Sequence, residues 1–296
     1  MIDRDYRLFA AVVEQGSLAG GARQLHMSRP MASKKIAALE ARLGTQLIYR
    51  TTRRLALTEA GQQFHSEVVN ILDAIDRAEA AVSGTRDRPR GALRMTAPTS
   101  FGRIYLPEAL TSFLDAFPDV ATSLHLSDEY VDLLGERIDL AIRITSQASQ
   151  QGLSAVRLGT SRRILCAAPS YLSRHSHPLA LADLRHHHLL AAAGQLPWSL
   201  QGPNGPVEFE GVSRIRTNSS ELVRELAIAG SGIALRSMWD IAEDLEAGRL
   251  VRVLPDFEGS LDVGIYAVRP EGSTVSHAVA AMLAHLQRWA ERWPLA

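Results

Sequence analysis

The chain has 296 residues, of which 46% are hydrophobic, and its Lys and Arg residues balance its Asp and Glu residues in number. This length suffices for two or more packed domains, and the absence of any run of about 18 apolar residues excludes a membrane span. The single cysteine, Cys166, excludes an intrachain disulfide, and the spaced apolar residues at the start exclude a secretory signal, so we expect a cytoplasmic protein.

The charge is unevenly distributed along the chain. Residues 1–60 contain ten Lys or Arg and five Asp or Glu residues, a net charge of +5, so the remaining 236 residues carry −5. A basic first segment on a neutral chain favours a polyanion as the partner of that segment, although solvated basic helix faces are also common.

Short helices are predicted in the first 44 residues. Apolar residues at helical spacing place the first helix at about residues 5–15, and Ser17 is the expected N-cap of a short second helix. Ser28 is the expected N-cap of a third helix, with Pro30 in its first turn and Gly44 after its end. Its inward stripe is predicted to be Ala32, Ile36, Leu39 and Leu43. Two short helices joined by a few residues are typical of a helix-turn-helix.

A basic segment rich in β-forming residues comes next, followed by a long helix. Residues 45–58 favour a two-stranded wing, and Thr58 is the expected cap of a helix that runs to about residue 83. The apolar residues of this helix are spaced alternately four and three apart, a coiled-coil seam that favours dimerisation; the alternative is packing on its own domain. The seam residues are Phe64, Val68, Ile71, Ile75, Ala78 and Val82.

The remainder of the chain is predicted to be a separate domain. Residues 84–90 contain Gly, Pro and charged residues and predict a hinge. Beyond them, strands alternate with helices, which favours an α/β fold with largely parallel strands. The expected strands are residues 92–98, 120–126, 139–144, 154–160, a set beginning at 162–169, 214–218, 232–236 and 261–268, and the final helix is expected at 275–293.

Two long motifs resemble those of the LysR-type transcriptional regulators. They are S-x-x-x-x-S-x-x-I-x-x-L-E-x-x-L-G from Ser28 and R-T-x-R-x-x-x-L-T-E-A-G from Arg50. LRMTAPTSFG, DLAIRI, LCAAPSYL, GIALRSMWD and GRLVRVLP extend the resemblance over nearly the whole chain. It implies a homotetramer built as a dimer of dimers.

The resemblance also implies a division of the chain. The expected parts are a winged helix-turn-helix at 1–60, a linker and dimerisation helix at 58–83, the hinge at 84–90, and a two-lobed effector domain like periplasmic binding proteins at 91–296. Its first lobe is expected at 91–161 and 268–296, and its second lobe at 162–267, with hinges near Arg162 and Gly264.

Helix geometry and the resemblance together predict the DNA-contacting residues. A first-turn Arg29 suits the O6 and N7 atoms of guanine, although Gln is frequent there in the family, and Lys34 suits phosphate. Gly20 and Gly21 replace the better helix formers usual in the family and are expected to soften the second helix. The predicted contacts are Ser28, Arg29, Pro30, Met31, Ser33, Lys34, Arg50, Arg53 and Arg54.

The effector site is predicted where strands give way to helices. Hydroxyls and free N–H groups at helix N-termini favour an anionic ligand beyond the strand ends, although ordinary N-caps have the same composition. Two arginines at strand ends, Arg143 and Arg236, suit either a ligand carboxylate or a structural salt bridge. The candidate residues are Thr99, Ser100, Phe101, Arg143, Asn218, Ser219, Ser220 and Arg236.

A small organic or aromatic acid is the expected effector, because GIALRS-x-W-D resembles one subgroup of the family that responds to such acids. RNA polymerase is a candidate partner, and neither a cofactor nor a membrane is expected.

Other functions are less well supported interpretations of the same sequence. Adjacent His186, His187 and His188 do not share one face of a helix or strand, so solvated loop histidines are favoured over a metal site. Cys166 is expected to be buried and inert. An α/β enzyme remains an alternative, although the sequence contains no nucleotide-binding loop, zinc motif or nucleophile elbow. A solute-binding protein with an accessory helical domain leaves residues 1–83 unexplained.

Overall fold

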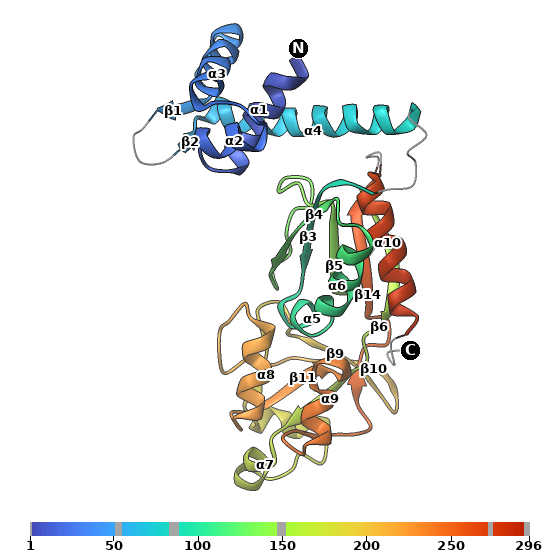
Figure 1. The fold of residues 1–296 in the computed structure, drawn as a ribbon. Helices are drawn as coiled ribbons and strands as arrows, with labels where there is room; N and C mark the ends of the chain where they lie inside the picture. The colour runs from blue at the N-terminus through green and yellow to red at the C-terminus, as the bar shows by residue number, and fades with distance from the viewer. Residues whose placement is uncertain (1, 51–54, 83–88, 147–151, 272–274, 293–296) are drawn as a thin grey trace. The chain divides into compact units, whose positions relative to one another are not determined.

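The computed structural model describes residues 2–50, 55–82, 89–146, 152–271 and 275–292 (Figure 1). The chain divides into two compact units, Met1–Arg88 and Pro89–Ala296. Most of the predicted hinge, residues 84–88, and the predicted DNA contacts Arg53 and Arg54 lie outside the described residues. No helix within the described ranges is long and apolar enough to cross a membrane.

The first unit is a winged helix-turn-helix. Its elements are α1 (Ile2–Glu14), α2 (Leu18–Gln24), α3 (Arg29–Leu43), β1 (Ile48–Arg50), β2 (Leu55–Leu57) and α4 (Glu59–Val82). The serine caps form as predicted: Ser17 Oγ accepts from the Gly20 N–H at 3.0 Å, and Ser28 Oγ accepts from the Met31 N–H at 3.4 Å. Gly44 ends α3 in the left-handed region at φ 68°, a conformation that glycine adopts at little cost.

The core of this unit explains the two unusual glycines of α2. Both are buried, and a Cβ atom on Gly21 would lie 2.6 Å from the backbone nitrogen of Val12 in α1. The absence of a side chain therefore allows α2 to pack closely against α1. This packing offsets the low helix propensity of glycine. Leu43, by contrast, is 36% exposed, so its place in the inward stripe is wrong: it is the last residue of α3, beyond the packed turns.

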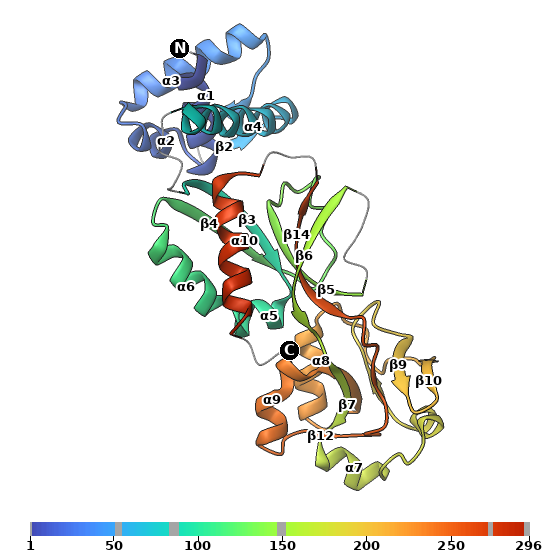
Figure 2. The same ribbon diagram turned by 90° about the vertical axis from the view of Figure 1, so that its right-hand side faces the viewer.

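The second unit consists of two lobes (Figures 1 and 2). Lobe I contains a five-stranded sheet in the order β4-β3-β5-β14-β6, with α6 and α10 packed together beside it. Its elements are β3 (Gly91–Ala97), α5 (Thr99–Ile104), α6 (Leu106–Ala116), β4 (Val120–Leu126), β5 (Leu140–Thr145), β6 (Leu153–Thr160), β14 (Gly264–Pro270) and α10 (His277–Ala290).

Lobe II has a sheet in the order β10-β9-β13-β7-β11-β8, with β12 also paired to β7. Its elements are β7 (Arg163–Ala167), α7 (Pro169–His175), the 3-10 helix η1 (Leu181–His186), β8 (Leu189–Leu190), β9 (Trp198–Gly202), β10 (Gly205–Phe209), α8 (Ser220–Ile228), β11 (Ile233–Ser237), α9 (Met238–Glu246), β12 (Val251–Arg252) and β13 (Glu258–Gly259).

The prediction of largely parallel strands is wrong. In lobe I, β3 is parallel to β4 and β5, but β14 is antiparallel to β5 and β6. In lobe II, the described pairs are antiparallel except β8 with β11. The chain leaves lobe I through β6 and returns through β14, and the two crossing segments run in opposite directions, which makes their pairing antiparallel (Figure 2).

Three further expectations need correction. The strand β14 pairs with β5 and β6 from Gly264 onward, so residues 264–267 belong to lobe I rather than to lobe II. Residues 214–218 are not a strand. The segment lies beside residues 189–193, and the Arg214 N–H donates to the Leu189 carbonyl at 2.8 Å. A single isolated β-bridge forms there, between Ser213 and Leu189. Ser276 caps α10, which ends at Ala290 rather than at Trp293.

Candidate functional site

The first turn of α3 presents a mixed apolar and basic surface. Arg29, Pro30 and Lys34 are exposed, Met31 is 54% exposed, and Ser33 is half-buried. The Ser28 hydroxyl caps the helix and holds this turn in place. An exposed methionine beside an arginine suits base edges in a major groove, where thymine presents a methyl group and guanine presents two acceptors.

Contacts within the unit hold α3 and the wing together. Lys35 Nζ donates to Asp5 Oδ1 of α1 at 2.7 Å, so this lysine anchors the helix instead of facing outward. Glu40 Oε1 accepts from the Leu47 and Ile48 N–H groups at 2.9 and 3.1 Å, which ties α3 to the start of the wing. The side chain of Arg50, which ends β1, is outside the described residues.

The seam of α4 divides into two parts. Phe64 packs against Tyr6 and Phe9, with ring centroids 5.4 Å apart in both pairs, and Val68 is fully buried in the same core. For Val68 the predicted contact with a second chain is wrong, because the first unit covers it completely. Ile71 is 42% exposed and Ile75 is half-buried. The side chains of Ala78 and Val82 fall outside the described residues.

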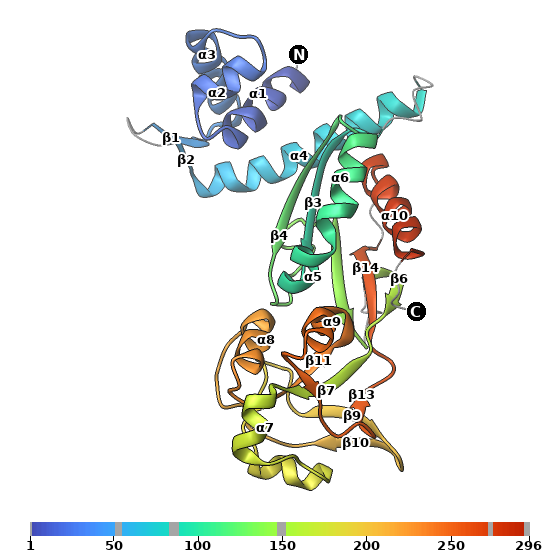
Figure 3. The same ribbon diagram turned by 60° about the horizontal axis from the view of Figure 1, so that its bottom comes forward.

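In lobe I, the predicted effector residues begin α5, which lies beside α8 and α9 of lobe II (Figures 1 and 3). Ser100 is 3% exposed, and its hydroxyl has no hydrogen-bond partner among the described residues. Phe101 is fully buried and packs against Tyr105 and edge-on against Trp239 of α9. Phe101 therefore belongs to the core, and its assignment as an effector contact is wrong.

In lobe II, the three residues before and at the start of α8 have different roles. Ser219 is an N-cap, since its hydroxyl accepts from the Leu222 N–H at 3.1 Å. The Ser220 hydroxyl accepts from Arg236 Nη1 at 2.6 Å. The Asn218 side chain donates to Glu129 Oε1 of lobe I at 2.8 Å, so this residue already crosses the boundary between the lobes.

An aspartate that the sequence reasoning missed joins the two junctions. Asp128 follows β4, and its Oδ1 accepts from the Thr99 N–H at 2.8 Å. Its Oδ2 accepts from the Ser220 N–H at 2.6 Å. The two predicted junctions therefore meet at one carboxylate. The available signal was its position, because Asp128 also follows a strand whose carboxyl end lies at the ligand-binding edge of a parallel sheet.

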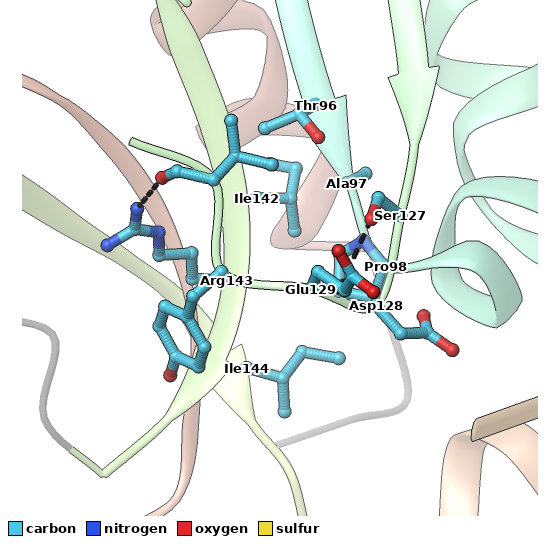
Figure 4. Close-up of a pocket in the computed structure, with 11 residues that line it drawn as sticks. Thr96, Ala97, Pro98, Ser127, Asp128, Glu129, Ile142, Arg143 and Ile144 are labelled. Atoms are coloured by element: carbon cyan, nitrogen blue, oxygen red, sulfur yellow. Dashed lines mark hydrogen bonds between the residues drawn. The ribbon is translucent and has the colours of Figure 1, made fainter. Parts of the chain in front are cut away.

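The two candidate arginines differ in environment. Arg236 is 5% exposed and donates from Nε to Asp240 Oδ2 at 2.9 Å, and its Nη2 contacts the same oxygen, so the salt-bridge alternative applies to it. Arg143 donates from Nη2 to the Val131 carbonyl at 2.9 Å, and its guanidinium lies over the Tyr130 ring. Arg143 also lines a pocket (Figure 4).

This pocket, of about 80 Å³, opens at the carboxyl ends of the parallel strands β3, β4 and β5. Figure 4 shows that it brings together apolar side chains of β5 and polar groups of the segment after β4. The lining residues are Thr96, Ala97, Pro98, Ser127, Asp128, Glu129, Tyr130, Val131, Ile142, Arg143 and Ile144. A small ligand with an apolar body and polar ends suits such a lining.

The adjacent histidines His186, His187 and His188 and the cysteine Cys166 lie in lobe II, away from this pocket. His187 is half-buried with Nδ1 3.2 Å from the Tyr171 hydroxyl, and burial and nearby His175 lower the pKa of His187. No group of three or more His, Cys, Asp or Glu residues within the described ranges is arranged to hold a metal ion. Cys166 is fully buried, and burial raises the pKa of its thiol to about 12, which makes it a poor nucleophile.

Comparison with known families assigns both units. The family model "Bacterial regulatory helix-turn-helix protein, lysR family" matches residues 4–62. The model "LysR substrate binding domain" matches residues 86–291.

Individual relatives agree with this assignment. The transcriptional regulator DmlR of Escherichia coli K12 is 33% identical over 295 residues, which cover 98% of this chain and 95% of DmlR. The transcriptional activator TtdR of Escherichia coli O6:K15:H31 is 31% identical over 293 residues, which cover 98% of this chain and 94% of TtdR.

Solved structures of full-length regulators have the same fold. The Vibrio cholerae virulence activator AphB aligns with a TM-score of 0.62 and 27% identity over 97% of this chain and 99% of AphB. CrgA from Neisseria meningitidis aligns with a TM-score of 0.58 and 28% identity over 97% of each chain.

These matches exclude the enzyme alternative, because the family and the relatives are regulators of transcription. The first unit binds DNA, the second binds a small-molecule effector, and the regulators of this group form oligomers. The chain belongs to the LysR family of transcriptional regulators.

Proposed function

We propose that this regulator reads its operator with the first turn of α3 and responds to a small carboxylate held between the two lobes. The observation that carries the effector assignment is the convergence of the Thr99 and Ser220 N–H groups, from opposite lobes, on one carboxylate group. Amide donors at the start of a helix favour a negative charge. Asn218 and Ser100 provide further donors near the same boundary.

The same proposal includes the assembly and location of the protein. It acts in the cytoplasm as a homotetramer, a dimer of dimers, on an interrupted palindrome, and effector binding changes the geometry of the DNA or the contact with RNA polymerase. Arg29, Pro30 and Met31 read base edges, whereas Lys34 and the wing arginines Arg50, Arg53 and Arg54 bind phosphate.

The effector assignment is tested by thermal-shift measurements on the full-length protein with a panel of small mono- and dicarboxylates. A concentration-dependent rise in melting temperature with at least one acid is expected, since a ligand that binds only the folded state stabilises it. Equal shifts with sulfate, or shifts only with amines, would contradict a carboxylate effector.

Ser100→Ala separates ligand binding from folding. The buried hydroxyl has no partner among the described residues, so its removal should leave the melting temperature unchanged or slightly raised. The affinity for the acid identified in the panel should fall about fivefold to tenfold, an ordinary loss for one hydrogen bond, in calorimetry on the full-length variant.

Thr122→Val is the matched control for Ser100→Ala. Thr122 Oγ1 is another buried hydroxyl without a partner in the described part of the chain, but it lies in the middle of β4. The control should resemble Ser100→Ala in stability and resemble the wild type in affinity. If both variants keep wild-type affinity, Ser100 does not contact the effector.

Ile71→Asp tests the self-association of α4. Ile71 remains 42% exposed, so a charge there leaves the first unit intact but is buried without a partner if a second helix covers it. Sedimentation should show self-association weakened by about tenfold or more. Gln62→Asp, at an exposed position of the same helix outside the seam, should sediment like the wild type. An unchanged Ile71→Asp oligomer would exclude this seam as the interface.

A further inference from the structure

The segment after β4 links the lobes through two neighbouring acidic residues. Asp128 accepts from the Thr99 N–H of lobe I at 2.8 Å and from the Ser220 N–H of lobe II at 2.6 Å. Glu129 accepts from the Asn218 side chain at 2.8 Å. Other polar contacts cross the same boundary, among them the ion pair between Arg103 and Glu221 at 2.7 Å. Lobe I thus reaches the start of α8 with its own carboxylates.

The position of Asp128 is the position that an anionic ligand would take. Its two oxygens each accept an N–H group from the first residue of a helix, and α8, at nine residues, is long enough to favour a negative charge there. Within the second unit, therefore, the two backbone N–H donors assigned to the effector are already satisfied by a residue of the chain itself.

A buried hydroxyl remains unsatisfied beside these contacts. Ser100 follows Thr99 directly, is 3% exposed, and has no hydrogen-bond partner within the described residues. A buried polar group without a partner destabilises the folded state, and this loss is recovered if an incoming ligand oxygen accepts its hydrogen bond. The Asp128 carboxylate leaves this donor unused, so a ligand with an additional oxygen gains a contact that Asp128 lacks.

We propose that Asp128 is an internal ligand of the effector cleft: its carboxylate occupies the anion position and holds the lobes together until a free carboxylate displaces it. This inference rests on the proposed function for the identity of the cleft. It adds that the chain competes with its own effector, which selects ligands that offer more contacts than a single carboxylate.

Competition of this kind has a quantitative consequence. The observed dissociation constant of a ligand is the intrinsic value divided by the fraction of molecules whose site is free. If Asp128 occupies the site in about 90–99% of molecules, binding of a free acid is weakened about 10- to 100-fold. Removing the Asp128 carboxylate should therefore create a site for the simplest carboxylate, acetate.

Hydrogen exchange of the full-length protein tests this directly. In Asp128→Ala, the amides of peptides covering residues 99–101 and 218–222 should exchange at least about tenfold faster than in the wild type, because two N–H groups lose their acceptor. Acetate should restore slow exchange in the variant, whereas chloride at equal ionic strength should not. Wild-type exchange should not change with acetate.

Two further variants serve as controls. Asp115→Ala removes an exposed carboxylate of α6 in the same lobe and should behave like the wild type, with or without acetate. Asp128→Asn keeps the size of the side chain but offers a single acceptor oxygen, so its exchange should be intermediate and the effect of acetate smaller. This variant keeps the test decisive if Asp128→Ala melts at a much lower temperature.

Each result has a defined meaning. Unchanged exchange in Asp128→Ala, or no effect of acetate on that variant, overturns the internal-ligand proposal. A wild-type response to acids that is unaltered in Asp128→Ala overturns it as well, and leaves the carboxylate effector in place. Rescue by acetate, with no acid affecting the wild type, supports the internal ligand and contradicts the effector class of the proposed function.

Discussion

Replacing Arg236 with Met should destabilise the second unit by roughly 3–5 kcal/mol, the usual effect of breaking a buried ion pair. Arg236 and Asp240 are 5% and 4% exposed, and the second oxygen of Asp240 has no hydrogen-bond partner among the described residues. Without the guanidinium, the Asp240 carboxylate stays buried and loses its ion-pair partner. This is a large fraction of the stability of a typical domain, about 5–15 kcal/mol.

Urea unfolding followed by tryptophan fluorescence measures this effect. All four tryptophans lie beyond residue 88, so their fluorescence reports on the second unit alone. The double variant Arg236→Met with Asp240→Leu removes both charges and should recover most of the lost stability. A loss below about 1 kcal/mol in the single variant would mean that Asp240 is compensated by another group.

The same ion pair is connected to the proposed effector cleft. Arg236 Nη1 donates to the Ser220 hydroxyl, and the Ser220 N–H donates to Asp128. We therefore infer that Arg236 positions the start of α8 rather than contacting the ligand directly. In the double variant, we expect the fold to recover while the affinity for the effector does not.

The local features of the first unit were predictable from sequence. Ser17, Ser28, Thr58 and Gly44 act through hydrogen bonds or backbone angles within a few residues, so short patterns suffice to place the helix ends. Val68 was misassigned because a heptad spacing does not reveal which partner covers it. Its neighbours in the first unit, from α1 and the wing, come from distant parts of the sequence.

The arrangement of the second unit depended on contacts that sequence patterns do not contain. The direction of β14 follows from a chain crossing between lobes twice, which no single strand pattern reveals. Asp128 was missed because its partners Thr99 and Ser220 are 29 and 92 residues away. Of the two predicted strand-to-helix junctions, only the one at Thr99 follows a strand, and the groups that meet at the starts of α5 and α8 are set by tertiary packing.

Arg29→Ala and Lys34→Ala should affect DNA binding in different ways. Arg29 lies in the exposed first turn of α3, where a two-pronged contact to guanine contributes about 1–3 kcal/mol of discrimination. Its removal should weaken binding to the operator about 5- to 150-fold and relax the preference at one base pair in each half-site. Lys34 is exposed one turn later, and the contact with phosphate proposed for it would carry no sequence information.

The measurement uses an operator selected from random DNA with the wild-type protein, and titrations at several salt concentrations. Lys34→Ala should weaken binding to the operator and to unrelated DNA equally. It should also make the negative slope of log K against log salt less steep by about 0.9. Arg185→Ala, an exposed position of lobe II, should change neither quantity and controls for the loss of one positive charge. Because base contacts alter the specificity ratio and phosphate contacts alter the salt slope, equal specificity profiles for the Arg29 and Lys34 variants would contradict the division of roles along α3.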